Sequence, residues 1–189
     1  MLRHSSSRNV PNGIFSDIYE GDIWKNFAIN PDDPQPFFTN DKLDSHIGLA
    51  LKIDWFQPFD YTVHSTGVIY GVLCNLPREE RLKPNNILTL GIIPDPNEPS
   101  KHQINHYLAP IVDELLEFFT DLELPIIFKN NKRQKIYVVL ILSANDVPAA
   151  RKICGHASHI VKCHHCSKHS KYDPDTKRNH YGSFKDIDE

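Results

Sequence analysis

The pattern of apolar and polar side chains predicts a series of short strands in the first half of the chain. Apolar residues alternate with small or polar ones over positions 47–54, the period of two expected for a strand, and this stretch ends at Asp54. Residues 66–73 and 87–93 are two further apolar stretches of strand length. The link between them is polar and turn-forming, so the sequence favours antiparallel pairing of these strands.

In the second half of the chain, the spacing of apolar residues first becomes that of a helix and then again that of a strand. Apolar residues recur every three or four positions over 104–119, which predicts an amphipathic helix with Asn105 as a plausible N-cap. A basic hairpin loop at 129–135 leads into a buried strand at 136–142. That strand is followed by Asp146 and a proline-opened helix.

The predicted element order is β-β-β-α-β, which indicates an α/β fold with a mixed sheet. Two short antiparallel links followed by a helical crossover bring the fourth strand back parallel to the first. If these strands are neighbours, about 4.8 Å apart, Asp54 and Asp146 lie at the same edge of the sheet. The sequence divides into an extended arm anchored by aromatic residues (1–45), a core (46–153) and a Cys/His-rich segment (154–189).

Paired carboxylates at such an edge are suitable oxygen ligands for Mg²⁺. Two Mg²⁺ ions about 3.5 to 4 Å apart can activate the attacking oxygen and stabilise the leaving oxygen in phosphodiester cleavage. Asp is also common in turns and caps that follow strands. Spacing alone therefore leaves both a metal-binding and a purely structural role open for Asp54 and Asp146.

A cluster of metal-type ligands follows the second acid. Cys163 and Cys166 form a Cys-x-x-Cys pair among several histidines, and such a pair supplies two thiolates of a tetrahedral Zn²⁺ site. His159 is favoured over His156 as a further ligand, and the fourth ligand is left open. A closed site of this kind would be structural. The alternative is a set of reduced surface thiols among polar histidines.

Charge is distributed unevenly along the chain. Residues 1–128 carry 9 Lys and Arg against 18 Asp and Glu, whereas residues 129–185 carry 12 against 3. A basic segment that follows an acidic body could contact a polyanion such as DNA, although solvated lysines are the alternative. The candidate phosphate contacts are Lys132, Arg133, Arg151 and Lys152.

No stretch of the sequence predicts a membrane segment. The longest apolar run, residues 136–142, is far shorter than the roughly 20 residues of a membrane span. The N-terminus has no apolar core of a signal peptide. We therefore expect an intracellular protein in which the cysteines are metal ligands rather than disulfides.

Several strings together resemble the transposases of CACTA-type DNA transposons, the Tnp2-like family, in the divergent form abundant in fungal genomes. They follow the family's order through residues 15 to 189. The strings are Asp54-Trp55-Phe56-Gln57-Pro58-Phe59, Asn75-Leu76-Pro77-Arg78, Gly91-Ile92-Ile93-Pro94, Asp146-Val147-Pro148-Ala149-Ala150-Arg151-Lys152 with Cys154-Gly155, and His159 before Cys163-x-x-Cys166.

The resemblance implies an RNase H-like fold and a DDE-type active site. In such a site three acids hold two Mg²⁺ ions for DNA cleavage and strand transfer at transposon ends. By motif, Asp54 matches the first acid and Asp146 the second. Cys163 and Cys166 match the family's Cys-x-x-Cys, and His159 occupies the histidine position before it.

The third acid of such transposases lies well beyond the Cys-x-x-Cys segment, on a helix that this sequence does not reach. We therefore expect a truncated RNase H-like fold in a fragment or degenerate copy of a DDE-type transposase, inactive by itself. An intact form would act on transposon ends in the nucleus and could self-associate. The alternative is a non-catalytic, zinc-braced module that binds nucleic acid or protein.

Overall fold

The computed structural model describes residues 13–30, 32, 34–60, 65–94, 99–100, 102–120, 123–126, 132–153 and 171–180. The helices among these residues are η1 (Ile18–Glu20), α1 (Asp22–Asn26), α2 (Arg78–Arg81), η2 (Pro84–Asn86), α3 (Ile104–Thr120) and α4 (Val147–Ile153). The strands are β1 (His46–Phe56), β2 (Thr66–Leu73), β3 (Ile87–Ile93), β4 (Glu123–Ile126), β5 (Lys132–Lys135), β6 (Tyr137–Ser143), β7 (Lys171–Asp173) and β8 (Arg178–His180).

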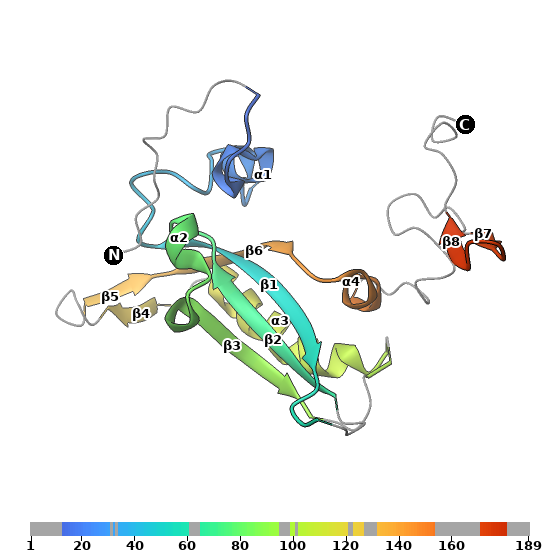
Figure 1. Ribbon diagram of the computed structural model, residues 1–189. Coiled ribbons are helices and arrows are strands. Elements are labelled where there is room, and N and C mark those ends of the chain that lie inside the picture. Colours follow the sequence, from blue (N-terminus) through green and yellow to red (C-terminus); the bar gives the residue numbers. More distant parts are fainter. Residues whose placement is uncertain are drawn as a thin grey trace.

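A mixed sheet of four strands forms the centre of the fold, in the order β3-β2-β1-β6 (Figure 1). β1 and β3 both pair antiparallel with β2, whereas β6 pairs parallel with β1. A parallel pair needs a long crossover, and α3 lies within this one, between β3 and β6. The prediction that the first and fourth main strands are parallel neighbours is therefore confirmed.

β1 is one of the two inner strands and is longer than predicted. The alternating pattern predicted a strand that ends at Asp54, but β1 continues to Phe56, which pairs with Thr66. The cause lies opposite Trp55, where Gly67 has no side chain. A Cβ on Gly67 would lie only 2.9 Å from Nε1 of Trp55, so the glycine gives the indole the room that it occupies. Asp54 is thus a residue within the strand.

The predicted basic hairpin also differs from the structure. β4 and β5 do pair antiparallel, but residues 132–135 form strand β5 rather than part of a loop. Glu123 lies opposite Lys135, and an opposite-charge pair across two strands stabilises the ribbon. A small ribbon exposed to water can carry such charged residues.

One face of the sheet packs against α3. Ile53 of β1, Ile69 of β2 and Ile93 of β3 are each 1% exposed, and they form a cluster with Ile104 at the start of α3. The amphipathic pattern therefore predicted the helix correctly, but its apolar stripe is buried only in part. Leu108 and Ile111 pack partly buried against this cluster, whereas Val112 and Leu116 are 47% and 58% exposed.

The start of α3 differs from the prediction, which placed the N-cap at Asn105. The helix already includes Ile104, whose N–H donates to the Ser100 carbonyl at 3.0 Å. Ser100 and Gln103 exchange side-chain hydrogen bonds with each other's backbone N–H, at 2.9 and 3.3 Å. This reciprocal pair is of the capping-box type, and it satisfies N–H groups that precede the helix.

The other face of the sheet is covered by aromatic residues of the segment before β1. Trp24 of α1 is buried, stacks on Phe38 at a centroid distance of 3.9 Å, and belongs to a cluster with Ala50 and Val72 of the sheet. Gly48 makes this close approach possible, because a Cβ there would lie 2.9 Å from the Trp24 ring. The sheet therefore has an apolar layer on both faces.

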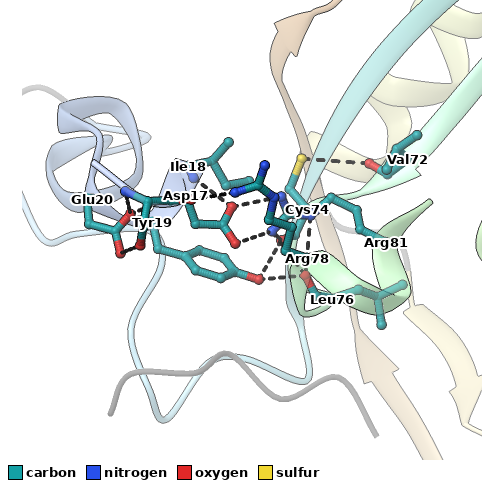
Figure 2. A network of polar contacts seen from close by, with 10 residues as sticks. Asp17, Ile18, Tyr19, Glu20, Val72, Cys74, Leu76, Arg78 and Arg81 are labelled. Carbon is teal, nitrogen blue, oxygen red and sulfur yellow. Dashed lines mark hydrogen bonds and ion pairs between the residues drawn. The ribbon is translucent and has the colours of Figure 1, made fainter. Parts of the chain in front are cut away.

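A buried ion pair joins the segment before β1 to the link between β2 and β3 (Figure 2). Arg81 of α2 donates to both oxygens of Asp17, at 2.8 and 3.3 Å, and the two side chains are only 12% and 4% exposed. The Arg81 guanidinium also donates to the carbonyls of Cys74 and Leu76, at 3.1 to 3.3 Å. The Tyr19 hydroxyl lies 2.8 and 2.7 Å from the same two carbonyls.

This network holds Asp17 in its charged form. Burial by itself raises the pKa of the Asp17 carboxyl, but the hydrogen bonds from Arg81 and from the Ile18 N–H, together with the positive charge of Arg81, outweigh it and hold the pKa below its usual range. A carboxyl whose pKa is lowered by folding stabilises the folded state above its unfolded pKa. That contribution is lost as the pH falls through the folded pKa.

We expect Arg81→Met to destabilise the protein by about 3 kcal/mol at pH 7, because it leaves the buried Asp17 carboxylate without a counter-charge. Urea denaturation followed by tryptophan fluorescence measures this change. The difference from the wild type should shrink below about pH 4, where protonation of Asp17 removes the unpaired charge.

Arg78→Met is the matched control, because Arg78 lies in the same short helix but is exposed. It donates a hydrogen bond of 3.1 Å to the Ser16 carbonyl and acts on Asp17 through its charge. Its effect should stay within about 0.5 kcal/mol. Equal losses in the two variants would show that the Asp17 pair does not anchor this segment.

Candidate active site

Asp54 lies on the half of β1 that extends past β6. In an extended strand it shares a face with Lys52, and the two side chains form an ion pair at 2.9 Å. Leu51 and Ile53 alternate with them and are buried in the cluster with α3. The Asp54 side chain is 49% exposed, so water and solutes reach its carboxylate.

Asp146 lies between β6 and α4, is exposed, and caps the helix. Its Oδ1 accepts a hydrogen bond from the Ala149 N–H at 2.9 Å, and its carbonyl accepts one from the Ala150 N–H at 2.9 Å. The structural role that the sequence left open for this acid is therefore present. A carboxylate offers about four acceptor positions, so a cap at one oxygen leaves the group able to bind a further partner.

The parallel pairing of β1 with β6 brings the two acids to the same end of the sheet. Leu51 and Ser143 are paired, and each acid lies three residues further along its own chain segment. This arrangement is what the sequence predicted from the topology. Within the described residues, no group of three or more His, Cys, Asp or Glu side chains is placed to hold a metal ion. The Mg²⁺ role of the pair stays a prediction.

Asn145 also belongs to this end of the sheet, although it is not among the site residues predicted from the sequence. Its Oδ1 accepts a hydrogen bond from the Ile53 N–H at 2.6 Å, so it connects the residue before Asp146 to the residue before Asp54. Its position in the sequence could have identified it, because Asn145 is a polar amide that lies just after a predicted strand and directly before an acid. Such a position favours side-chain hydrogen bonds to the backbone.

The predicted phosphate contacts fall into two separate groups. Arg151 and Lys152 lie in α4, and the Lys152 ammonium is 4.5 Å from the centre of the Trp55 ring, next to Asp54. Lys132 and Arg133 lie in β5, which precedes β6, and Figure 1 shows β5 and α4 at opposite ends of β6. Only the α4 pair therefore lies at the end of the sheet that carries the two acids. Trp55 alternates with Asp54 along β1, so the Lys152 contact is on the opposite face of the strand from the Asp54 side chain.

The predicted zinc ligands His159, Cys163 and Cys166 lie outside the described residues. The cysteine that the structure does describe, Cys74, belongs to the core. Burial raises the pKa of its thiol to about 11, so it stays protonated near neutral pH and is a poor metal ligand. It is therefore separate from the Cys/His cluster in chemistry as well as in sequence.

None of the helices in the described part of the chain is both long enough and apolar enough to cross a membrane.

Comparison with known proteins agrees with the resemblance seen in the motifs. The model of the family described as transposase family tnp2 matches residues 12–182. No curated protein and no solved structure matches the chain. The matched range includes both acids, the sheet, the arm aromatics and the Cys/His segment. The chain belongs to the tnp2 family of transposases.

Proposed function

We propose that Asp54 and Asp146 are two of the acids of a DDE-type active site, built on an RNase H-like core. The observation that carries this proposal is the parallel pairing of β1 with β6, because it brings both acids to one end of neighbouring strands. The sheet order β3-β2-β1-β6 agrees with an RNase H-like core, in which the first and fourth strands lie side by side. Family membership supports the assignment of the reaction as DNA transposition.

The two carboxylates suit Mg²⁺, which prefers carboxylate oxygens and keeps several water ligands. The partner of Asp54 is an exposed lysine, and an ion pair of this kind contributes at most about 1 kcal/mol, so a divalent cation can displace it. Asp146 keeps one oxygen for its helix cap and presents the other. When bound, two Mg²⁺ ions would supply activation of the attacking oxygen and stabilisation of the leaving oxygen.

The residues around the acids position the DNA. Arg151 and Lys152 of α4 contact backbone phosphates of the transposon end, because α4 begins directly after Asp146 and Lys152 reaches the Trp55 ring. Lys132 and Arg133 of β5 contact a more distant part of the same DNA. An intact transposase of this kind acts in the nucleus and could self-associate.

A complete DDE site needs a third acid, and none is assigned in this sequence. Two carboxylates hold a divalent cation more weakly than three, because each ligand contributes to the affinity. We therefore propose that the residues of this chain by themselves bind metal weakly and do not cleave DNA. Its acids would act in a form that supplies the third ligand.

His159, Cys163 and Cys166 are proposed to hold a structural Zn²⁺ that braces the basic segment. The support is the Cys-x-x-Cys spacing and the ligand types. A zinc brace without metal at the two acids would instead describe a non-catalytic module that binds nucleic acid or protein. Metal measurements on the two sites separate these functions.

Asp54→Asn and Asp146→Asn should each weaken Mn²⁺ binding by at least about tenfold, since loss of a ligand costs no less than loss of its supporting contacts. Both changes keep the shape of the side chain, and Asn caps a helix as well as Asp does. The measurement is an Mn²⁺ titration of the full chain, with Zn²⁺ already bound so that thiolates do not compete.

The control is Asp113→Asn, an exposed acid on α3 that should leave Mn²⁺ binding unchanged. Unchanged affinity in both Asp54→Asn and Asp146→Asn would refute the site. Salt-sensitive DNA binding together with that result would favour the non-catalytic module.

Asp146→Ala should destabilise the fold by about 1 kcal/mol, because the Ala149 N–H loses its acceptor, whereas Asp146→Asn should be nearly neutral. Thermal unfolding of the three proteins measures the difference. Asp146→Asn removes the negative charge but keeps the cap, whereas Asp146→Ala removes both. The difference between the two variants therefore measures the contribution of the cap. Equal stability of Asp146→Ala and the wild type would show that the cap contributes nothing.

The purified chain should contain one tightly held zinc, and Cys163→Ser should lose it, because thiolate ligands dominate such sites. Elemental analysis of the purified proteins gives the stoichiometry. Cys74→Ser is the control, because this buried, protonated thiol should not affect zinc content. A wild-type chain without zinc at any stoichiometry would contradict the brace.

A further inference from the structure

Two asparagine side chains hold the backbone of β1, one near each end. Near its start, Asn75 is fully buried; its Oδ1 accepts from the Gly48 N–H at 2.8 Å and its Nδ2 donates to the His46 carbonyl at 2.9 Å. Near its end, Asn145 accepts from the Ile53 N–H at 2.6 Å. The two contacts are chemically alike, but only the second lies beside the acids.

Asn145 continues the pairing of β1 at the point where the β6 backbone leaves the sheet. The last backbone hydrogen bond there runs from the Ala144 N–H to the Leu51 carbonyl, at 2.8 Å. The next donor on that side of β1 is the Ile53 N–H, which meets a side-chain oxygen instead of a backbone carbonyl. The main chain at Asn145 is therefore released from the sheet ladder without leaving this donor unpaired.

The orientation of the amide is fixed by its partners. A backbone N–H can only donate, so the atom that faces Ile53 must be the amide oxygen. The amide nitrogen then faces the Ser143 hydroxyl at 2.5 Å, and that hydroxyl lies 3.4 Å from the Leu51 carbonyl. The contacts with Ile53 and Leu51 join the end of β6 to β1, and the contact between Asn145 and Ser143 lies at the end of β6 itself. The Asn145 side chain therefore has little freedom to rotate.

This hydrogen bond ties together the two neighbours of the acids. Consecutive Cα atoms are about 3.8 Å apart, so Ile53 determines where the Asp54 backbone lies and Asn145 does the same for Asp146. Had β6 continued as a strand beyond Asn145, α4 could not begin directly after Asp146. The amide thus fixes the second acid to β1 and also permits the turn into the helix.

We propose that Asn145 is a positioning residue that sets the relative placement of Asp54 and Asp146 for metal binding; this inference rests on the proposed function. Groups that orient metal ligands typically change metal affinity by 10- to 100-fold when they are removed. The fold should survive the loss, because α4 has other contacts with the core. Lys152 lies over the Trp55 ring, and Ile153 packs against the cluster that contains Ile53.

The test is the Mn²⁺ titration of the zinc-loaded full chain with Asn145→Ala, together with Asn75→Ala as the matched control. Asn145→Ala should weaken Mn²⁺ binding about tenfold. Asn75→Ala should lower the thermal stability at least as much, because it leaves two buried backbone groups unpaired, and should keep the wild-type affinity. If Asn145→Ala does not fold, Asn145→Ser serves instead, because its hydroxyl is too short to reach Ile53.

Asn145→Asp supplies the rescue, because a carboxylate oxygen can still accept from the Ile53 N–H. It should retain at least the wild-type Mn²⁺ affinity, and hydrogen exchange at the Ile53 amide should stay slow. In Asn145→Ala that amide should exchange faster. Fast exchange combined with unchanged Mn²⁺ affinity would show that the bond has a structural role only.

The outcomes separate this inference from the proposed function. If the Asp54 and Asp146 variants lose Mn²⁺ while Asn145→Ala retains it, the positioning role is wrong and the site stands. If Asn75→Ala weakens Mn²⁺ binding as much as Asn145→Ala does, the effect is a general loosening of the sheet and the positioning role is again wrong. If neither acid variant alters binding, both proposals fall.

Discussion

The parallel pairing of β1 with β6 is the interaction on which the arrangement of the candidate site depends. Parallel strands require a crossover, and α3 supplies it while also covering one face of the sheet. The pairing places the two acids at one end of the sheet although they are 92 residues apart in sequence. A register shift of one residue would turn Asp54 toward the face that Ile53 now occupies, where an unpaired charge is costly. Burial of Ile53 against α3 therefore also fixes the direction of the acid.

The two ends of β1 differ: the contacts that stabilise the strand lie near its start, and the candidate site lies near its end. The start of β1 is held by Asn75, by Trp24 through the space at Gly48, and by the nearby network of Asp17 and Arg81. A buried pair of this kind contributes little net free energy when intact, because desolvation offsets much of the attraction, yet loss of one partner is costly. The end of β1 is more open, with the exposed pair of Lys52 and Asp54. A buried end and an accessible end suit the proposed role of this strand, in which Asp54 is a metal ligand.

The cap made by Asp146 is compatible with the metal-binding role proposed for the same side chain. Its cap uses one carboxylate oxygen and fixes the start of α4, and the same bond limits the directions in which the other oxygen can point. A ligand that is already oriented loses less conformational entropy on binding a metal. The alternatives that the sequence left open for this acid are therefore compatible. Asp54 differs, because its neighbour Lys52 can be displaced by a divalent cation.

The sequence by itself determined the local elements and their order. Apolar stretches of strand length predicted β2 and β3 closely, and the spacing of three to four residues predicted α3. The motifs identified the transposase family. Each of these signals is local in the chain. Tertiary structure alone decided that β1 passes Asp54, since the space over Gly67 lies on a different strand. It also decided that Asn145 reaches Ile53 and that Arg81 reaches Asp17, contacts between residues 92 and 64 positions apart. Such contacts depend on how distant segments meet, and no periodicity within one segment encodes them.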